Sequence, residues 1–248
     1  MKTDVVILTR NPALFGKCMD SLQKWSIQHV DKVLVGYTGT SDDERREIEN
    51  GLRYAWKPDG NSVVKRFVYN FASNVDDLIN DYAASDAVLL LNDDVELTED
   101  AIGPCLEVVE NMSVGTVGIR LVYPDETIQH AGIFTKVVNG QFGGVGHVLH
   151  HAPDRQLKPL VTHGNTGAFL MTRLQTWKRL GGLDRNFQHC FEDVCYCWDV
   201  MAAGLMNITM ANIKAYHLES ATRKQAISAA DIQRLKDHFE QVKDRIEW

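Results

Sequence analysis

Two adjacent carboxylates, Asp93 and Asp94, follow an apolar run over residues 87–91. Such a run predicts a strand that is buried on both faces of a mostly parallel sheet. Ligands of open α/β sheets bind beyond the carboxyl ends of the strands, so this pair is well placed to hold a metal ion or a polar ligand. Mg²⁺ and Mn²⁺ prefer such oxygen ligands. The alternative is a plain turn, since Asn and Asp are good turn residues.

A second acidic pair, Glu192 and Asp193, lies within a segment that is expected to be helical, residues 187–198. Acidic residues in the first turn of a helix also stabilise its dipole, so helix capping is the alternative to a catalytic role. His217 follows a predicted edge strand at 208–216. Its imidazole is either a structural group or a metal ligand.

The composition is that of an ordinary globular protein. The chain has 248 residues, 44% of them hydrophobic and 24% charged, and this length suits one large α/β domain. Its net charge of −7 argues against a general nucleic-acid-binding protein, which needs basic patches. No run approaches the roughly 18 apolar residues that a membrane helix requires, so we expect no membrane span.

The cysteines predict a reducing compartment. Five are present, an odd number, which fits the cytoplasm and buried thiols. Cys195 and Cys197 are spaced C-x-C, but no second pair completes a conventional zinc spacing.

The first ninety residues alternate between predicted strands and helices. Asn11 is expected to cap the first helix, with Pro12 at its first position, and residues 41–44 form a capping box. The predicted strands are residues 5–8, 33–35, 62–68 and 87–91, and the predicted helices start at 12, 41 and 74 and end near 25, 52 and 82. This alternation predicts a parallel sheet with helices on both faces. No G-x-G-x-x-G follows the first strand, which argues against a nicotinamide dehydrogenase.

The pattern changes after the first acidic pair. Thr98 is expected to cap a helix over residues 99–111. A glycine-rich stretch through Leu157 predicts either a functional loop or lid, or a mobile surface loop. The other predicted elements are strands at 116–122, 127–138 and 166–171, a short helix that ends at Gly181-Gly182, and a C-terminal helix from Ser228. That helix is expected to dock on the domain, and a homo-oligomer formed through it is the alternative.

Taken together, these motifs resemble the family-two glycosyltransferases of the GT-A fold, among them O-antigen and rhamnosyltransferase enzymes. The resemblance covers roughly residues 4–220 and rests on the order and spacing of the motifs. In chain order they are Thr9-Arg10-Asn11, Tyr69-Asn70-Phe71, Leu90-Leu91-Asn92-Asp93-Asp94-Val95-Glu96-Leu97, Tyr123-Pro124-Asp125, Ile128-Gln129-His130-Ala131-Gly132, Gly146-His147, Gly167-Ala168-Phe169-Leu170, Gly181-Gly182-Leu183-Asp184, Phe191-Glu192-Asp193-Val194 and His217.

The resemblance implies a GT-A fold, with a mostly parallel central sheet flanked by helices and a smaller mixed region on the acceptor side. Residues 1–97 would bind the nucleotide sugar, residues 98–227 would form the acceptor side, and residues 228–248 would be a C-terminal helix. The implied donor is a nucleotide-diphosphate sugar, and the implied acceptor is a glycan or a lipid-linked glycan. A cytoplasmic protein, with a peripheral role at the membrane as an option, would fit such substrates.

The resemblance also implies roles for single residues. Asp94 matches the direct ligand of a Mn²⁺ or Mg²⁺ ion, and Asp93 the residue that helps hold the metal or the donor ribose. His217 matches the histidine that reaches the metal or the diphosphate. Asp193 matches the catalytic base of an inverting single displacement, with Glu192 beside it on the acceptor side.

The nucleotide would be bound by a further set of residues. Thr9, Arg10 and Asn11 match the first loop under the nucleotide, and Asn70 is expected to contribute to the same site. Where the family usually has an aspartate after the second strand, this chain has Gly36-Tyr37, and Tyr37 is the candidate to stack on the base instead.

Two further departures follow the second acidic pair. Cys195 and Asp199 stand where the family commonly has an acid and a basic residue. A catalytically silent domain that binds sugar nucleotides or glycans is therefore an alternative hypothesis. A nucleotidyltransferase is a third, and the absence of a glycine-rich, lysine-bearing phosphate loop argues against it.

Overall fold

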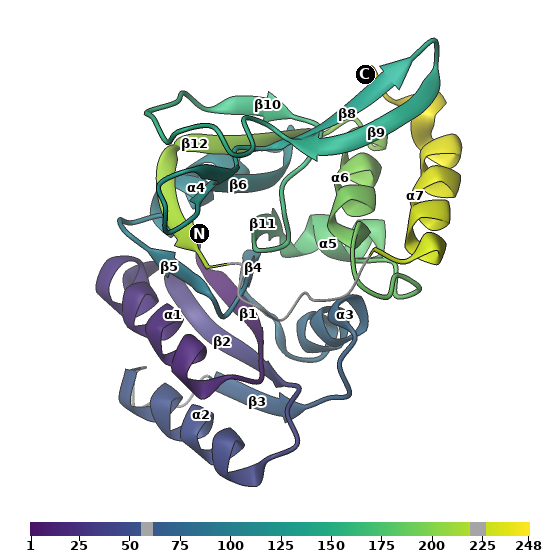
Figure 1. Ribbon diagram of the computed structural model, residues 1–248. Coiled ribbons are helices and arrows are strands. Elements are labelled where there is room, and N and C mark those ends of the chain that lie inside the picture. The colour runs from purple at the N-terminus through teal and green to yellow at the C-terminus, as the bar shows by residue number, and fades with distance from the viewer. Residues whose placement is uncertain (56–61, 219–226) are drawn as a thin grey trace.

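The computed structural model describes residues 1–55, 62–218 and 227–248, and it shows one large curled sheet with helices packed against it (Figure 1). The strands are β1 (Thr3–Thr9), β2 (Val30–Tyr37), β3 (Ser62–Arg66), β4 (Ala87–Leu91), β5 (Val95–Leu97), β6 (Val114–Val122), β7 (Ile128–His130), β8 (Ile133–Val138), β9 (Gln141–His147), β10 (Leu160–Thr162), β11 (Phe169–Arg173) and β12 (Met206–His217). The helices are α1 (Pro12–Trp25), α2 (Asp42–Ala55), α3 (Phe71–Tyr82), α4 (Ile102–Val109), α5 (Leu174–Leu180), α6 (Glu192–Ala202) and α7 (Ala229–Val242), with short 3₁₀ turns η1 (Ile27–His29) and η2 (Lys243–Arg245).

The first four strands form the expected parallel sheet. They lie in the order β4-β1-β2-β3, and each pair is parallel. The Asn11 side chain caps α1 as predicted, since it accepts hydrogen bonds from the N–H groups of Ala13 and Leu14. Helix α3 begins three residues earlier than predicted because Asn70 caps it by accepting from the N–H of Ser73 at 2.8 Å.

The second half of the sheet is mixed. Strand β11 lies between β4 and β6 and is antiparallel to both. Strand β12 pairs in parallel with β6 and antiparallel with the short β10. The prediction that residues 208–216 form an edge strand is therefore wrong, because β10 covers that edge.

The segment after the first acidic pair also differs from the prediction. Residues 95–97 form β5, which pairs with the end of β12, and α4 begins only at Ile102. Thr98 does not cap that helix, because its hydroxyl donates to the carbonyl of Lys214 at 2.7 Å. Strand pairing from a distant part of the chain thus replaces the first turn of the predicted helix.

The glycine-rich stretch is not an irregular loop at its start, since β8 and β9 form an antiparallel hairpin. Its turn residues, Asn139 and Gly140, have φ values of 50° and 73°. An Asn-Gly pair with positive φ at both positions is a strong hairpin signal. The predicted strand over 127–138 is divided at Gly132, whose φ of 112° breaks the extended backbone between β7 and β8.

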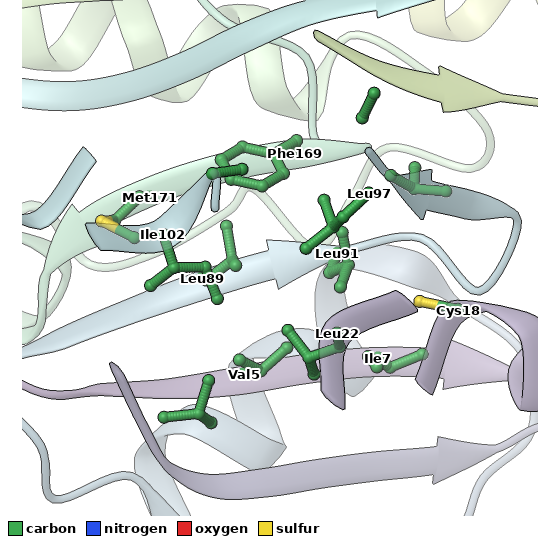
Figure 2. Packing of buried hydrophobic residues seen from close by; sticks show 14 of the residues in the cluster. Val5, Ile7, Cys18, Leu22, Leu89, Leu91, Leu97, Ile102, Phe169 and Met171 are labelled. Carbon is green, nitrogen blue, oxygen red and sulfur yellow. The ribbon is translucent and has the colours of Figure 1, made fainter. Parts of the chain in front are cut away.

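Alternate residues of the central strands face opposite sides of the sheet. On one side Val5, Ile7, Leu89 and Leu91 pack against α1, α2 and α4, and Figure 2 shows Cys18 and Leu22 of α1 close to Ile7. On the other side Val6, Val88 and Leu90 pack against α3, α5 and α6. The central strands are thus buried on both faces, as the apolar runs predict.

Helix α7 docks on the domain, as expected for its apolar stripe. Phe239 is fully buried, and its ring centroid lies 5.8 Å from Trp198 of α6 and 5.3 Å from Phe142 of β9. In Figure 1 the helix lies beside α6, with the β8–β9 hairpin above them. No helix among the described residues has both the length and the apolar character to cross a membrane.

Candidate active site

A pocket of about 400 Å³ opens where the carboxyl end of β4 meets the start of α6. This volume lies within the range of small-molecule sites. The residues that line it come mainly from the end of β1 and the start of α1, the segments after β2 and β3, the β4–β5 connection, the segment before β11, the loop into α6 with its first turn, and the end of β12. They are Leu8, Thr9, Arg10, Asn11, Leu14, Thr38, Tyr69, Phe71, Asn92, Asp93, Asp94, Thr166, Gly167, Ala168, His189, Cys190, Glu192, Asp193, His217 and Ile227.

Strand pairing brings Asp94 and His217 together. His217 ends β12 and pairs with Val95 of β5, and the N–H of Leu218 donates to the carbonyl of Asp94 at 3.1 Å. As a result, His217 Nε2 lies 3.1 Å from Asp94 Oδ1. Both residues are more than nine-tenths buried. The structure therefore unites two of the three predicted metal-site residues in a fixed geometry.

This pair fits a divalent cation. Two ligand atoms that bind one ion at about 2.1 Å from adjacent octahedral positions lie about 3.0 Å apart, close to the observed separation. Within the described parts of the chain, no group of three or more His, Cys, Asp or Glu side chains is arranged to hold a metal. The protein would thus supply a minority of the ligands, as is common for Mg²⁺ sites that also use water and substrate phosphates.

Asp93 lies beside this pair in a different environment. Burial raises its pKa to about 6, and the neighbouring carboxylate of Asp94 raises it too, while a hydrogen bond from the Thr9 side chain and the charge of Arg10 lower it. Thr9 and Arg10 both line the pocket. The first loop and the end of β4 thus form one wall, as the resemblance implies.

Asp193 belongs to a second wall of the pocket, formed at the start of α6, and is held by the backbone. Its Oδ2 accepts from the N–H of Gly167 and its Oδ1 from the N–H of Val194, both at 2.8 Å. The bond to Val194 lies in the first turn of α6, so Asp193 also stabilises the start of that helix, the alternative raised above. Glu192, beside it, is 5% exposed and lines the same pocket.

Helix α7 supports this wall from outside. Asp231, which is fully buried, accepts hydrogen bonds from the N–H groups of Gln188 and His189 at 3.0 and 3.1 Å. The His189-Cys190 segment lines the pocket just before α6. The C-terminal helix thus holds a pocket loop in place.

Two predicted nucleotide-site residues lie elsewhere. Tyr37 is fully buried outside the pocket, and its hydroxyl donates to the carbonyl of Ser41 and to Glu44 Oε2, both at 2.8 Å. Its ring is therefore covered and has no open face for a base. Asn70 uses its side chain to cap α3 and to donate to the carbonyl of Phe187 at 3.3 Å. Asn11 does line the pocket, although its side-chain oxygen caps α1.

The residues at the departures from the family pattern, Gly36, Cys195 and Asp199, do not line the pocket. A Cβ at Gly36 would lie only 2.4 Å from Leu8 Cδ2, so tight packing explains the glycine. Cys195 packs in the apolar cluster between α6 and α7, where burial raises the pKa of its thiol. Asp199 Oδ1 lies 3.1 Å from His238 Nε2 of α7. Cys195 and Asp199 thus serve the docking of α7.

Sequence reasoning missed several pocket residues. Thr38, next to Tyr37, lines the pocket, and so does Tyr69, which precedes Asn70 and is 56% exposed. His189 and Cys190 precede the acidic pair directly, and that position is the only sequence signal for them. The prediction of buried thiols is confirmed for four of the five cysteines, and Cys190 is half-buried.

Comparisons with known proteins support the fold. No protein-family model matches the chain. It is 32% identical over 167 residues to the O-antigen biosynthesis protein RfbC of Myxococcus xanthus, an alignment that covers 62% of this chain and 13% of that protein. It is 34% identical over 143 residues to the uncharacterized protein y4gI of Sinorhizobium fredii, covering 55% of this chain and 16% of that protein. The chain thus spans less than a fifth of these relatives.

Solved structures resemble almost the whole chain. GalNAc-T7 with UDP, GalNAc and Mn²⁺ has a TM-score of 0.77 at 10% identity, covering 96% of this chain and 48% of that one. The mannosyltransferase PcManGT of Pyrobaculum calidifontis with GDP-Man and Mn²⁺ has a TM-score of 0.63 at 15% identity, covering 97% and 63%. S. aureus TarS 1-349 with UDP has a TM-score of 0.62 at 13% identity, covering 95% and 63%. The predicted GT-A fold is confirmed.

Proposed function

We propose that this chain, which has the GT-A glycosyltransferase fold, transfers a sugar from a nucleotide-diphosphate donor to a hydroxyl group of a glycan. One observation carries the proposal. A single pocket has the cation-compatible pair Asp94 and His217 on one wall and the backbone-anchored carboxylate of Asp193 on the other. Transfer needs a group that stabilises the leaving diphosphate and a group that activates the acceptor, and the two walls can supply them.

The donor side would be formed by Asp94, His217, Asp93 and the first loop. A Mn²⁺ or Mg²⁺ ion bound by Asp94 and His217 would supply positive charge against the leaving diphosphate. Two of the solved relatives contain Mn²⁺ with a sugar or a nucleotide sugar. Arg10 lines the same wall and adds a permanent positive charge near the phosphates.

The acceptor side would be formed by Asp193 and Glu192. A sugar hydroxyl is a weak nucleophile until a base takes its proton, and the Asp193 carboxylate would take that proton. Its two backbone hydrogen bonds fix the direction of its remaining lone pairs. Attack from the face opposite the leaving group inverts the anomeric centre, so one displacement without a covalent intermediate would suffice.

The class of acceptor follows from the sequence relative. RfbC is named for O-antigen biosynthesis, so a bacterial surface glycan, free or lipid-linked, would be the acceptor. The five free cysteines fit a reducing compartment such as the cytoplasm.

The test is a panel of UDP, GDP and dTDP sugars, each measured with Mn²⁺, with Mg²⁺ and with EDTA. We expect metal-dependent binding of one donor class and slow release of free nucleotide. Binding without turnover, even when glycan acceptors are supplied, would favour the silent binding domain. No binding of any nucleotide sugar would overturn the proposal.

A further inference from the structure

The imidazole ring of His217 is contacted at both nitrogens. Nδ1 is hydrogen-bonded to Gln129 Oε1, on a side chain that is 6% exposed. Nε2 faces the pocket, 3.1 Å from Asp94 Oδ1 and 3.3 Å from Asn92 Nδ2. An amide oxygen only accepts hydrogen bonds, so the contact with Gln129 Oε1 favours the form of the ring in which Nδ1 carries the proton.

We propose that Gln129 is a positioning residue that keeps the proton of His217 on Nδ1 and so leaves Nε2 as the nitrogen that binds a cation. The inference rests on the proposed function in one respect, that His217 faces a metal ion. An imidazole binds a metal only through an unprotonated nitrogen, and the partner of the other nitrogen decides which one that is. Without Gln129, the neutral ring could place its proton on Nε2, where it would donate to Asp94 and block the site.

The backbone around Gln129 is built to hold this contact. Its strand, β7, pairs with β6 through Leu121 and His130. On the other side, the N–H of Ile128 donates to the carbonyl of Ala152, and the N–H of His151 donates to the carbonyl of Ile128, both at 2.8 Å. Because β7 is hydrogen-bonded on both sides, its backbone holds Gln129 in place against the His217 ring.

The amide also suits this task better than a charged group would. Asp94 already faces Nε2, and a second carboxylate at Nδ1 would favour a doubly protonated ring that competes with the cation. A neutral acceptor orients the ring without adding that charge. Gln129 therefore differs in role from Asp94, because it does not reach the pocket.

The first experiment is ¹⁵N NMR of histidine-labelled wild-type protein at a pH where the rings are neutral, and again with saturating Mg²⁺. The His217 signal is assigned by its loss in His217→Gln. We expect the Nδ1–H tautomer without Mg²⁺ and a shift of Nε2 when Mg²⁺ binds. A wild-type ring with its proton on Nε2 would overturn the inference, and this measurement requires no variant at Gln129.

The second experiment compares variants by calorimetric titration with Mn²⁺. Gln129→Leu removes the acceptor, and we expect Mn²⁺ affinity to fall by about 10- to 100-fold, the usual cost of losing a partner of a metal ligand. Gln129→Asn keeps an amide on a shorter side chain and serves if the leucine variant does not fold. Unchanged Mn²⁺ affinity and an unchanged tautomer in a folded variant would overturn the inference.

Thr135→Val is the matched control. Thr135 is as buried as Gln129, at 6% exposure, and it too makes a side-chain hydrogen bond, accepting from Trp198 Nε1 at 3.0 Å. We expect Thr135→Val to leave Mn²⁺ affinity unchanged, and an equal loss in both variants would mean that Gln129 acts only through stability. If wild-type protein shows the expected tautomer and Mn²⁺ affinity but transfers no sugar, the role of Gln129 stands and the proposed function fails.

Discussion

The two acidic pairs face one pocket but are held in different ways. Asp94 is fixed by contacts between side chains and strands that are distant in the sequence, above all with His217. Asp193 is fixed by N–H groups of the backbone at Gly167 and Val194. The first arrangement leaves an imidazole nitrogen and a carboxylate oxygen close together, as a cation needs, and the second leaves a carboxylate oriented toward the pocket without a cationic partner among these contacts.

The difference shows how two aspartates, Asp94 and Asp193, can have different roles because their surroundings differ. A carboxylate oxygen beside an imidazole nitrogen can bind a cation together with it. A carboxylate that accepts two backbone N–H bonds is instead well oriented to act as a base. Asp93 adds a third case, since burial and the charge of Asp94 raise its pKa to about 6. Variants at Asp193, Asp94 and Asp93 test this comparison.

The largest effect is expected on the acceptor side. Asp193→Asn removes the base but keeps the shape, so sugar transfer should fall by about 10²- to 10⁴-fold while donor affinity changes little. Single-turnover transfer and donor titration measure the two quantities. Glu192→Gln, next to it, is the comparison, with a smaller expected loss. A variant that transfers normally but no longer binds donor would reverse the assignment of the two walls.

The donor side should respond in the opposite way. Asp94→Asn weakens one of the two protein ligands, and Mn²⁺ affinity should fall by at least about 100-fold, with donor affinity falling alongside it. Calorimetric titration with Mn²⁺ measures this. Glu96→Gln, two residues further on and outside the pocket lining, should change neither value. If Asp94→Asn binds Mn²⁺ as wild-type protein does, the cation lies elsewhere.

Asp93 should affect stability in a pH-dependent manner. Its folded pKa of about 6 lies above the unfolded value of about 3.9, so its ionisation disfavours the folded state as pH rises through 6. Asp93→Asn should therefore raise the free energy of unfolding of the metal-free protein by about 1–3 kcal/mol at pH 7.5, and by almost nothing at pH 4. Urea titrations at both pH values measure it. Equal effects at both pH values would contradict the raised pKa.

The smallest effects are expected on stability, at one glycine in each half of the chain. A Cβ at Gly140, in the hairpin turn, or at Gly51, in α2, would meet nothing within 4 Å. Gly140 has a φ of 73°, so Gly140→Ala should cost about 1–2 kcal/mol of stability. Gly51→Ala should instead add about 0.5–1 kcal/mol, because alanine favours helix. Thermal unfolding tests both, and a neutral Gly140→Ala would show that the turn tolerates another conformation.

The sequence predicts the first half of the fold well because its order is local. Each of the first three strands is followed by its own helix, and signals such as Asn11-Pro12 act over a few residues. The second half depends on pairings between distant segments, such as β11 inserted between β4 and β6, which no local pattern reveals. The Asn139-Gly140 turn was an available local signal for the hairpin.

The candidate site was likewise predictable only in part. The pocket is lined by Asp93, Asp94, Glu192, Asp193 and His217, which motif order and the rule that ligands bind beyond the carboxyl ends of strands can identify from the sequence. The hydrogen bond between Gln129 and His217 joins residues 88 positions apart, and it follows only from the fold. Tyr37 was misplaced because a tyrosine in a sequence carries no sign of whether its ring is covered.

The most direct test is the position of the cation. Crystals grown with Mn²⁺ and the nucleoside diphosphate that binds best would show Mn²⁺ by its anomalous scattering. We expect a peak within bonding distance of Asp94 and His217 Nε2, and not at Asp193. A nucleotide bound with its Mn²⁺ away from Asp94 and His217 would contradict the division of the pocket into a donor wall and an acceptor wall.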